Sequence, residues 1–349
     1  MFELVQKRLP GASEQELWDH ERTLTAEAKA LAHRAFVLHD RAATLEAHRT
    51  LYALHLAQLG VPWQAPSVNH AHPVVAKIRY CLQSACDRAE ELAASRHLGA
   101  LPPVNSFRGW ITGLVQKHAA YPIHPVFFFL RDSATHEQLQ QFLFQETPLE
   151  MLFGDIVACM LPGVYGEAKA ALARNFWDEV GRAQDDRVHR NLRAKLMHRA
   201  GIAPDAHITA IGNFVVEELA LVNMYLGMAF NRCKLTQLIG SMLATELVIP
   251  GRFEYLIAGW LRVGLDAPAL DYLTEHTTVD EGHAEDWLEK VVGSVLAQNP
   301  AAMREIAIGV VRRLNNAYAV TQALQSMLLT TTQVRNPETQ QHSELVASL

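Results

Sequence analysis

Apolar residues recur at helical spacing along almost the whole 349-residue chain, and this pattern limits the available folds more than any other feature. Apolar side chains that return every three or four residues line one face of an α-helix, whereas strands need an alternating pattern. Alternating runs rich in Val, Ile and Thr, closed by Asn-Gly or Asp-Gly turns, are missing from the sequence. The sequence therefore predicts an all-α fold.

Capping residues, prolines and glycines mark the expected helix boundaries. Ser13 and Glu16 have the spacing of a capping box, which predicts the start of a long helical stretch that ends before Gly60 and Pro62. The expected helical segments are 13–59, 73–98, 106–118, 126–161 (as one helix or two abutting helices), 166–200 with an interruption at GRAQDD, 208–230, 234–248, 252–264, 268–297 and 301–333.

The segment YPIHP carries two prolines in four positions and indicates a domain boundary. Before it, residues 1–120 are expected to form an N-terminal helical extension that serves packing or dimerisation. Residues 121–335 are expected to form the functional core, as a helical bundle. The polar tail 336–349 is expected to fray.

Composition and charge exclude several classes of protein. The chain is 49% hydrophobic with a net charge of −6, which argues against disorder, and 31 Lys+Arg against 37 Asp+Glu leave no basic surplus for nucleic acid. The four cysteines lack CxxC spacing, so neither a disulfide framework nor a zinc knuckle is indicated. The sequence has no signal-peptide core and no apolar run of about 18 residues. We therefore expect a cytoplasmic protein with neither a membrane nor a nucleic-acid partner.

Three polar side chains share one stripe of a helix in the segment YLTEHTTVDEGHAEDWL. His276, Asp280 and His283 stand at i, i+4 and i+7, so an imidazole, a carboxylate and a second imidazole lie on one face. Burying such a stripe without a partner would cost free energy, and a bound metal removes that cost. The alternatives are a solvent-exposed polar face and a set of satisfied core histidines.

Acidic residues on otherwise apolar helices extend this cluster. Glu246 lies in SMLATELVIP, Glu146 lies in QQFLFQETPLEMLF with Glu150 one turn later, and Glu179 and His189 lie in NFWDEVGRAQDDRVH. Each acid could instead be a charge on a helix surface. Four carboxylates would balance the charge of two ferrous ions in the low-dielectric interior of a bundle. The candidate ligands are Glu146, Glu179, His189, Glu246, His276, Asp280 and His283.

Residue spacing disfavours two familiar metalloenzyme scaffolds. No Glu is followed by a His three residues later, as a ferritin-like diiron site requires, and the HExxH motif of zinc proteases is absent. Two further acids, Glu217 and Glu218, either face the same pocket or form a salt bridge between helices.

The positions of Glu179 and His189 require a break in their helix. The two residues are ten positions apart, so on an unbroken helix they would point roughly 80° away from each other. We therefore expect the chain to bend near Gly181 and GRAQDD, which lets both residues meet.

With these candidate ligands, the chain resembles the heme-oxygenase-like diiron oxidases and oxygenases over about residues 121–330. The specific part is the H-x3-D-x2-H spacing that begins at His276, preceded by Glu246 30 residues earlier. The resemblance implies a heme-oxygenase-like helical bundle that holds two Fe(II)/Fe(III) ions on the seven candidate ligands, with Glu150 as an alternative to Glu146. Glu179 resembles the additional carboxylate of the N-oxygenating branch.

The activity implied by this resemblance is that of a non-heme diiron oxygenase. Such an enzyme reduces O2 to a peroxo-diferric species and N-oxygenates a small amine, guanidine or aminoazole to a hydroxylamine, or further to a nitroso or nitro product, in specialised-metabolite biosynthesis. An external reductant or reductase is implied, because the sequence carries no flavin or nicotinamide fingerprint. A homodimer is expected. The alternatives are a diiron desaturase, lyase or decarboxylase acting on an amino acid or fatty acid, and a metal-free helical binding module.

Overall fold

The computed structural model describes residues 1–7, 9–61, 68–202 and 208–335, with all of their side chains except those of Lys7, Pro10, Pro250, 278–283 and 331–335. Within these ranges the chain forms helices and no strand, which confirms the predicted all-α fold. None of the helices in this part of the chain is long and apolar enough to span a bilayer. The predicted tail 336–349 lies outside the described residues.

The predicted helical stretch 13–59 is wrong as a single element, because it divides into α2 to α4. The capping box of Ser13 and Glu16 is confirmed at the start of α2, and the chain leaves the helical conformation at His20. His39 adopts a left-handed φ of 54°, and the Asp40 side chain then caps α4 by accepting from the Ala43 amide at 2.7 Å. The N-terminal helices are α1 (Phe2–Lys7), α2 (Glu14–Asp19), α3 (Glu21–Phe36), α4 (Arg41–Leu59) and α5 (Pro73–His97).

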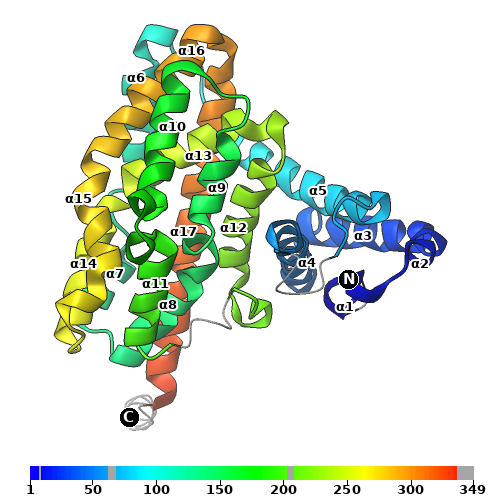
Figure 1. Cartoon of the computed structure of the whole chain (residues 1–349), viewed down its shortest axis with the longest axis horizontal. Helices are drawn as coiled ribbons and strands as arrows, with labels where there is room; N and C mark the ends of the chain where they lie inside the picture. Colours follow the sequence, from blue (N-terminus) through cyan, green and yellow to red (C-terminus); the bar gives the residue numbers. More distant parts are fainter. Residues whose placement is uncertain (8, 62–67, 203–207, 336–349) are drawn as a thin grey trace, which may run out of the picture.

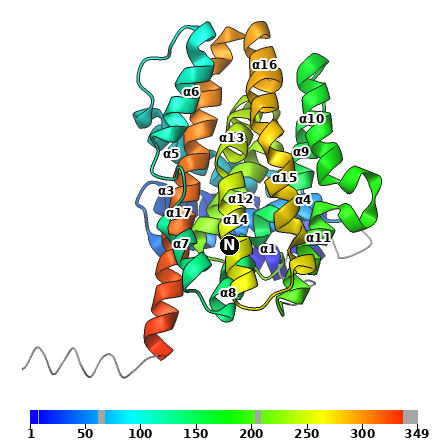
Figure 2. The same ribbon diagram turned by 90° about the vertical axis from the view of Figure 1, so that its left-hand side faces the viewer.

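The remaining helices stand side by side as an elongated bundle (Figures 1 and 2). They are α6 (Phe107–Gln116), α7 (Pro125–Asp132), α8 (His136–Glu150), α9 (Phe153–Met160), α10 (Gly166–Glu179), α11 (His189–Arg199), α12 (Val216–Ala229), α13 (Leu235–Val248), α14 (Pro250–Arg262), α15 (Asp271–Asp286), α16 (Gly293–Gln298) and α17 (Met303–Arg335).

Several predicted boundaries in the bundle need correction. The segment 126–161 forms three helices because Thr135 and Gln138 build a second capping box that starts α8. The predicted end of 234–248 is confirmed, because α13 ends at Val248, but the next helix starts at Pro250 rather than 252, where the missing N–H of proline is not needed. The stretch 268–297 is divided by a π-helical turn at Trp287–Val292. Within the segment 208–230, the α-helix starts only at Val216.

The centre of the bundle is formed by α12 and α13, whose side chains are buried over most of their length, and by the segment 306–314 of α17. Helix α6 belongs to the predicted N-terminal extension, yet its residues Phe107, Ile111 and Val115 are part of the same buried cluster as the bundle helices. The N-terminal helices and the bundle therefore share part of one core.

Helices α13 and α17 cross at Gly240 and Gly309, each of which packs on the backbone of the other helix and leaves no room for a side chain. A Cβ atom on Gly309 would lie 1.9 Å from the Gln237 carbonyl oxygen, and one on Gly240 would lie 2.0 Å from the Ile306 carbonyl oxygen. The Ser241 hydroxyl donates to the Gly309 carbonyl at 2.9 Å across the same contact. The two backbones touch here, so this crossing fixes the relative position of both helices.

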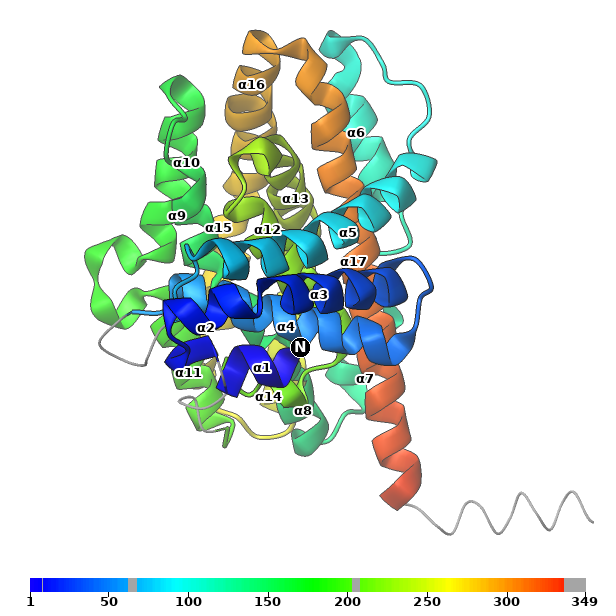
Figure 3. The same ribbon diagram turned by 90° about the vertical axis from the view of Figure 1, so that its right-hand side faces the viewer.

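Helices α3, α4 and α5 lie across one side of the bundle (Figure 3). Asn223 of α12 joins α4 to the bundle, because its amide nitrogen donates to the His48 carbonyl at 2.8 Å and its oxygen lies 3.1 Å from His55 Nδ1. Arg312 of α17, which is fully buried, donates to Asp87 at 2.8 Å and Glu90 at 2.6 Å, both on α5.

The glycine crossing predicts a large effect of a single methyl group. Gly309→Ala forces a Cβ atom into the backbone of α13, so we expect the free energy of unfolding to fall by about 2–3 kcal/mol. Denaturant unfolding monitored by circular dichroism measures this change. Gly113→Ala is the matched control, because a Cβ atom on this helical glycine meets nothing within 4 Å. The control should change stability by no more than about 1 kcal/mol, in the stabilising direction. Equal stabilities of the two variants would contradict the close crossing.

The buried histidines of α4 predict a loss of stability in acid. Burial lowers the pKa of His48 to about 4 and that of His55 to about 3, against 6.5 in the unfolded chain. The unfolded state therefore takes up protons first as the pH falls below about 6.5. Each histidine should reduce the free energy of unfolding by up to about 1.4 kcal/mol per pH unit from there down to its folded pKa.

Denaturant unfolding of His48→Gln and His55→Gln across pH 4 to 8 tests this origin of the acid sensitivity. Each substitution should flatten the dependence of stability on pH, whereas His20→Gln, which replaces an exposed histidine, should leave it unchanged. A slope that is the same in all four proteins would show that other groups cause it.

Candidate metal centre

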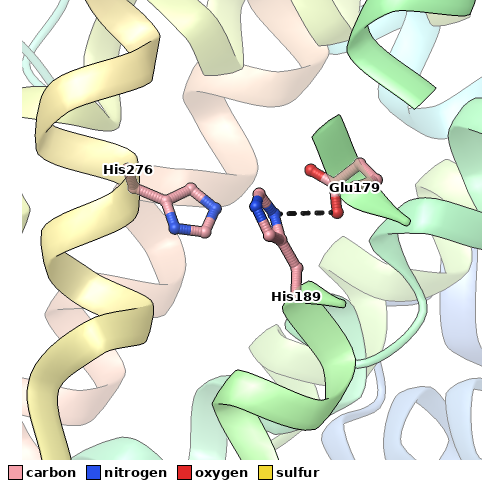
Figure 4. Close-up of side chains that lie close together, drawn as sticks. All are labelled: Glu179, His189 and His276. Carbon is pink, nitrogen blue, oxygen red and sulfur yellow. Dashed lines mark ion pairs between the residues drawn. The ribbon is translucent and has the colours of Figure 1, made fainter. Parts of the chain in front are cut away.

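Three of the predicted ligands meet between α10, α11 and α15. One ligand atom from each of Glu179, His189 and His276 lies within 4.8 Å of the other two. Glu179 Oε2 is 3.2 Å from His189 Nδ1, and the two imidazole rings have their centroids 4.6 Å apart. Figure 4 shows the three side chains converging from their separate helices. The structure thus brings together a carboxylate and two imidazoles around one point.

The predicted bend between Glu179 and His189 is confirmed. Glu179 is the last residue of α10 and His189 is the first of α11, and two short 3-10 turns, Gly181–Ala183 and Asp185–Arg187, connect them. Gly181 has a φ of +66°, and a Cβ atom there would lie 2.4 Å from the backbone of Arg187 and Val188. Only glycine fits this position, so the residue sets the geometry of the turn.

Two arginines attach this turn to α15 beside His276. Arg182 lies 3.5 Å from Glu275, and Arg187 donates to the same carboxylate. Glu275 directly precedes His276, so these ion pairs hold the turn against the helix that supplies the third cluster residue.

The imidazole of His276 is oriented by its own helix. Its Nδ1 lies 2.8 Å from the Tyr272 carbonyl oxygen, which accepts a hydrogen bond when Nδ1 carries the proton. This tautomer leaves the Nε2 lone pair for a metal, and such outer hydrogen bonds are typical of metal-binding histidines. The rings of Phe253 and Tyr272 pack on His276 with centroids 5.0 and 4.6 Å away.

Glu150 and Glu246 line the same cavity as the three clustered residues. Glu246 is a buried residue of α13, 6% exposed, and its neighbours Thr245 and Ile249 also line this cavity. We call the cavity bounded by Glu150, Glu179, His189, Glu246 and His276 the metal cavity. It contains the chemically mixed oxygen and nitrogen donors that the sequence predicted.

Glu146 occupies a different position from the other predicted ligands. It lies one turn before Glu150 on α8, and it lines an adjacent cavity rather than the metal cavity. Arg252 of α14 donates to Glu146 Oε1 at 2.7 Å and to Glu150 Oε1 at 2.9 Å, and Tyr272 donates to Glu150 Oε2. Of the two acids left open by the sequence, the structure therefore places Glu150 next to the cluster.

The two glutamates of α8 are separated electrostatically as well as in space. Burial raises the pKa of Glu146, and the negative charge of Glu150 acts in the same direction. Burial acts against ionisation of Glu150 too, but the guanidiniums of Arg252 and Arg193 and the Tyr272 hydroxyl bring its pKa below the usual range. Glu150 is therefore the acid of this pair that stays ionised and able to bind a cation.

Asp280 and His283 follow His276 on α15, which runs through both positions. Their side chains lie outside the described residues.

The donor set fits iron better than a structural zinc ion. Carboxylate oxygens mixed with imidazole nitrogens suit iron or manganese, whereas structural zinc sites are rich in thiolates. Cys159, the cysteine on the neighbouring helix α9, does not line the metal cavity. The side chains present in the cavity can therefore hold a redox-active metal ion.

The sequence reasoning missed the arginines around this centre. Arg193 is fully buried, donates to the Leu143 carbonyl at 2.8 Å and lies with its guanidinium carbon 5.3 Å from the centre of the Tyr272 ring. Arg313 lines the metal cavity, and its Nε donates to Thr245 at 3.0 Å. A signal was present for Arg313, which lies just after the apolar run IAIGVV, because charged residues in such stretches are rarely buried without a role. The polar segment HRNLRAKLMHR gave no such signal for Arg193.

The comparison with known proteins agrees with this chemistry. A family model described as iron-containing redox enzyme matches residues 140–318, which is just over half of the chain. The matched region contains all seven predicted ligands and Glu150. No curated protein matches the chain.

The turn between α10 and α11 yields a prediction about Gly181. Gly181→Ala combines an unfavourable φ with a backbone clash, whereas Gly166→Ala, at a φ of +67° with nothing within 4 Å, has the φ cost alone. We expect the Gly166 variant to lose about 1–2 kcal/mol of unfolding free energy and the Gly181 variant to lose clearly more. Hydrogen exchange of amides 181–188 should accelerate only in the Gly181 variant. Unchanged exchange there would contradict the role given to this glycine.

Proposed function

The chain belongs to the family of iron-containing redox enzymes, and on this premise we propose that it is a non-heme diiron oxygenase acting on the nitrogen of a small amine, guanidine or aminoazole. Family membership makes the protein an iron-dependent oxidoreductase with an all-α, heme-oxygenase-like bundle. The number of iron ions, the use of O2 and the nitrogen substrate are parts of our proposal.

The cluster of Glu179, His189 and His276 is the single observation that carries the proposal, because it offers three iron ligands within 4.8 Å of one another. We propose Glu150 and Glu246 as further ligands, since they line the same cavity. Asp280 and His283 complete the proposed set from α15. In this assignment Glu150 replaces Glu146 as the ligand from α8.

Residues around the ligands hold them in place before iron arrives. Arg252 and Tyr272 donate to the two oxygens of Glu150 and so hold this carboxylate in place. Each oxygen keeps a further lone pair that a metal ion can use. The Tyr272 carbonyl fixes the tautomer of His276. The apolar rings of Phe153 and Phe253 also line the cavity and limit the access of water.

Iron held by these residues would supply the redox chemistry, passing electrons from an external donor to O2 so that one oxygen atom reaches the substrate nitrogen. The overall reaction consumes an amine, O2, two electrons and two protons, and it yields a hydroxylamine and water. The two electrons come from an external donor, either a reductase or a small reductant. The protein contributes the position of the substrate and the charge balance of the site.

The assignment of the ligands predicts the outcome of an iron titration. Under anaerobic conditions the protein should bind two Fe(II) per chain. Glu179→Gln and His276→Ala each remove a donor, so at least one of the two ions should bind about 100-fold more weakly or not at all. His198→Ala is the matched control, because His198 lies on α11 with His189 but is exposed outside the cavity.

The helical circular dichroism of each variant serves as the check on folding. Two outcomes contradict the metal assignment: a wild-type protein that takes up no Fe(II), and an uptake that is the same in the Glu179 and His276 variants as in the control.

The reaction itself is tested by mass spectrometry of small amines, guanidines and aminoazoles incubated with protein, Fe(II), O2 and ascorbate. A product heavier by one oxygen atom, with the oxygen derived from labelled O2, supports N-oxygenation. Loss of hydrogen or of a one-carbon fragment would indicate oxidation of carbon instead.

A further inference from the structure

A second cavity adjoins the metal cavity, and the two share Leu149, Glu150, Ile249 and Arg313 as walls. We call it the side cavity. Much of its lining is apolar, including Phe127, Phe142, Leu221, Val248, Val320 and Leu324. The same cavity is also lined by Glu146, Glu150, Glu218, Arg252 and Arg313. A molecule bound here would have both apolar and charged surroundings and would lie next to the metal cavity.

Glu218 of α12 is a buried acid that lies in the electrostatic field of Arg252 and Arg313. It is 1% exposed, and its carboxyl group makes no hydrogen bond or ion pair within the described part of the chain. Burying a carboxyl group without a partner costs free energy, so such residues are rare unless they bind something. Glu218 does not form the salt bridge between helices that was one of its two predicted roles. It lines the side cavity instead.

Glu146 also keeps an oxygen available to the side cavity. Its Oε1 accepts from Arg252, but its buried Oε2 has no hydrogen-bond partner among the side chains and backbone that the structure describes. Two carboxyl groups, one on α8 and one on α12, therefore line one cavity with unused acceptor oxygens.

The acids of the side cavity can pair with a positively charged guest. Arg252 is already shared between Glu146 and Glu150, so Oε2 of Glu146 and the Glu218 carboxyl group keep acceptor oxygens for an ammonium or guanidinium group. Burial raises the pKa of both acids, and a bound cation would favour their ionised forms, whereas a bound carboxylate would oppose them.

We propose that the side cavity binds a small molecule through its ammonium or guanidinium group, which pairs with Glu218 and with Oε2 of Glu146 while its apolar body lies among the aromatic and aliphatic side chains. This inference rests on the proposed function only in treating the bound cation as the substrate. It narrows the nitrogen substrates to those that carry a positive charge and an apolar portion.

Arg313 offers the competing interpretation. Its Nη1 is buried with no hydrogen-bond partner among the described residues, and Arg313 lines both cavities, so a carboxylate could bind there instead. A length-matched series of probes separates the two possibilities: n-hexylamine, hexanoate and 1-hexanol, titrated calorimetrically into the iron-free protein at constant ionic strength.

We expect hexylamine to bind at least tenfold more tightly than hexanoate or hexanol. Glu218→Gln should weaken hexylamine binding at least tenfold, because it removes the charge and keeps the shape. Glu217→Gln, at the neighbouring position outside the cavity, should leave binding unchanged. Ala317→Phe, which fills the cavity from α17 and replaces none of its acids, should also weaken binding at least tenfold.

Tighter binding of hexanoate than of hexylamine would overturn the proposal in favour of Arg313. Hexylamine binding that survives both Glu218→Gln and Ala317→Phe would overturn it as well. Because the titration uses neither iron nor O2, its result is independent of the iron titration. Failure of iron uptake alone would remove the proposed function and leave the cation site standing.

Discussion

The crossing of α13 and α17 at Gly240 and Gly309 is the constraint on which the metal cavity depends. It holds the backbones of the two helices in contact, and each helix contributes a residue to the lining of the metal cavity within two turns of its glycine. Glu246 follows Gly240 on α13, and Arg313 follows Gly309 on α17. The hydrogen bond from Arg313 to Thr245 closes this arrangement just before Glu246. Glu246, which we propose as a ligand, and the buried cation Arg313 are thus positioned by a packing contact that takes no part in the chemistry.

Buried guanidiniums change the charge balance expected from the sequence. Four carboxylates against two ferrous ions predicted near neutrality, but the centre also contains Arg193, Arg252 and Arg313 together with the acids Glu150 and Glu218. The arginines stabilise the carboxylates in the protein as it stands, so the ligand positions do not depend on metal to avoid repulsion. The side chains proposed as metal ligands are therefore held in position in the protein as it stands.

Local patterns in the sequence were sufficient to predict the all-α fold and the bend between two residues of the candidate site. The ten-residue spacing of Glu179 and His189 required a bend, and Gly181 marked its place, because the geometry of one turn follows from a few neighbouring residues. The break at Asp40 was missed for the opposite reason: the apolar pattern continues through it, and only the cap shows it.

Contacts between distant segments could not be derived from the sequence. Arg252 pairs with Glu146 and Glu150, which lie more than 100 residues away in the sequence. Helical periodicity describes neighbouring residues only and cannot predict such pairs. The same limit left the choice between the two glutamates open, since they share one face of α8. The sequence could not predict that Glu218 makes no hydrogen bond or ion pair within the described part of the chain, because this depends on the side chains that neighbouring helices place around it.

The ion pairs of Arg312 have a consequence for the order in which the chain can assemble during its synthesis. Asp87 and Glu90 leave the ribosome more than 220 residues before Arg312 does. Until Arg312 has been synthesised, the two acids lack the cation with which they pair. Asn223, whose amide donates to the His48 carbonyl of α4, is also synthesised well after α4. The N-terminal helices share a buried apolar cluster of their own, from Val5 to Leu82, so they can pack on one another early. The ion pairs that join α5 to the bundle form only after α17 has been made, so the layer that is made first is docked last.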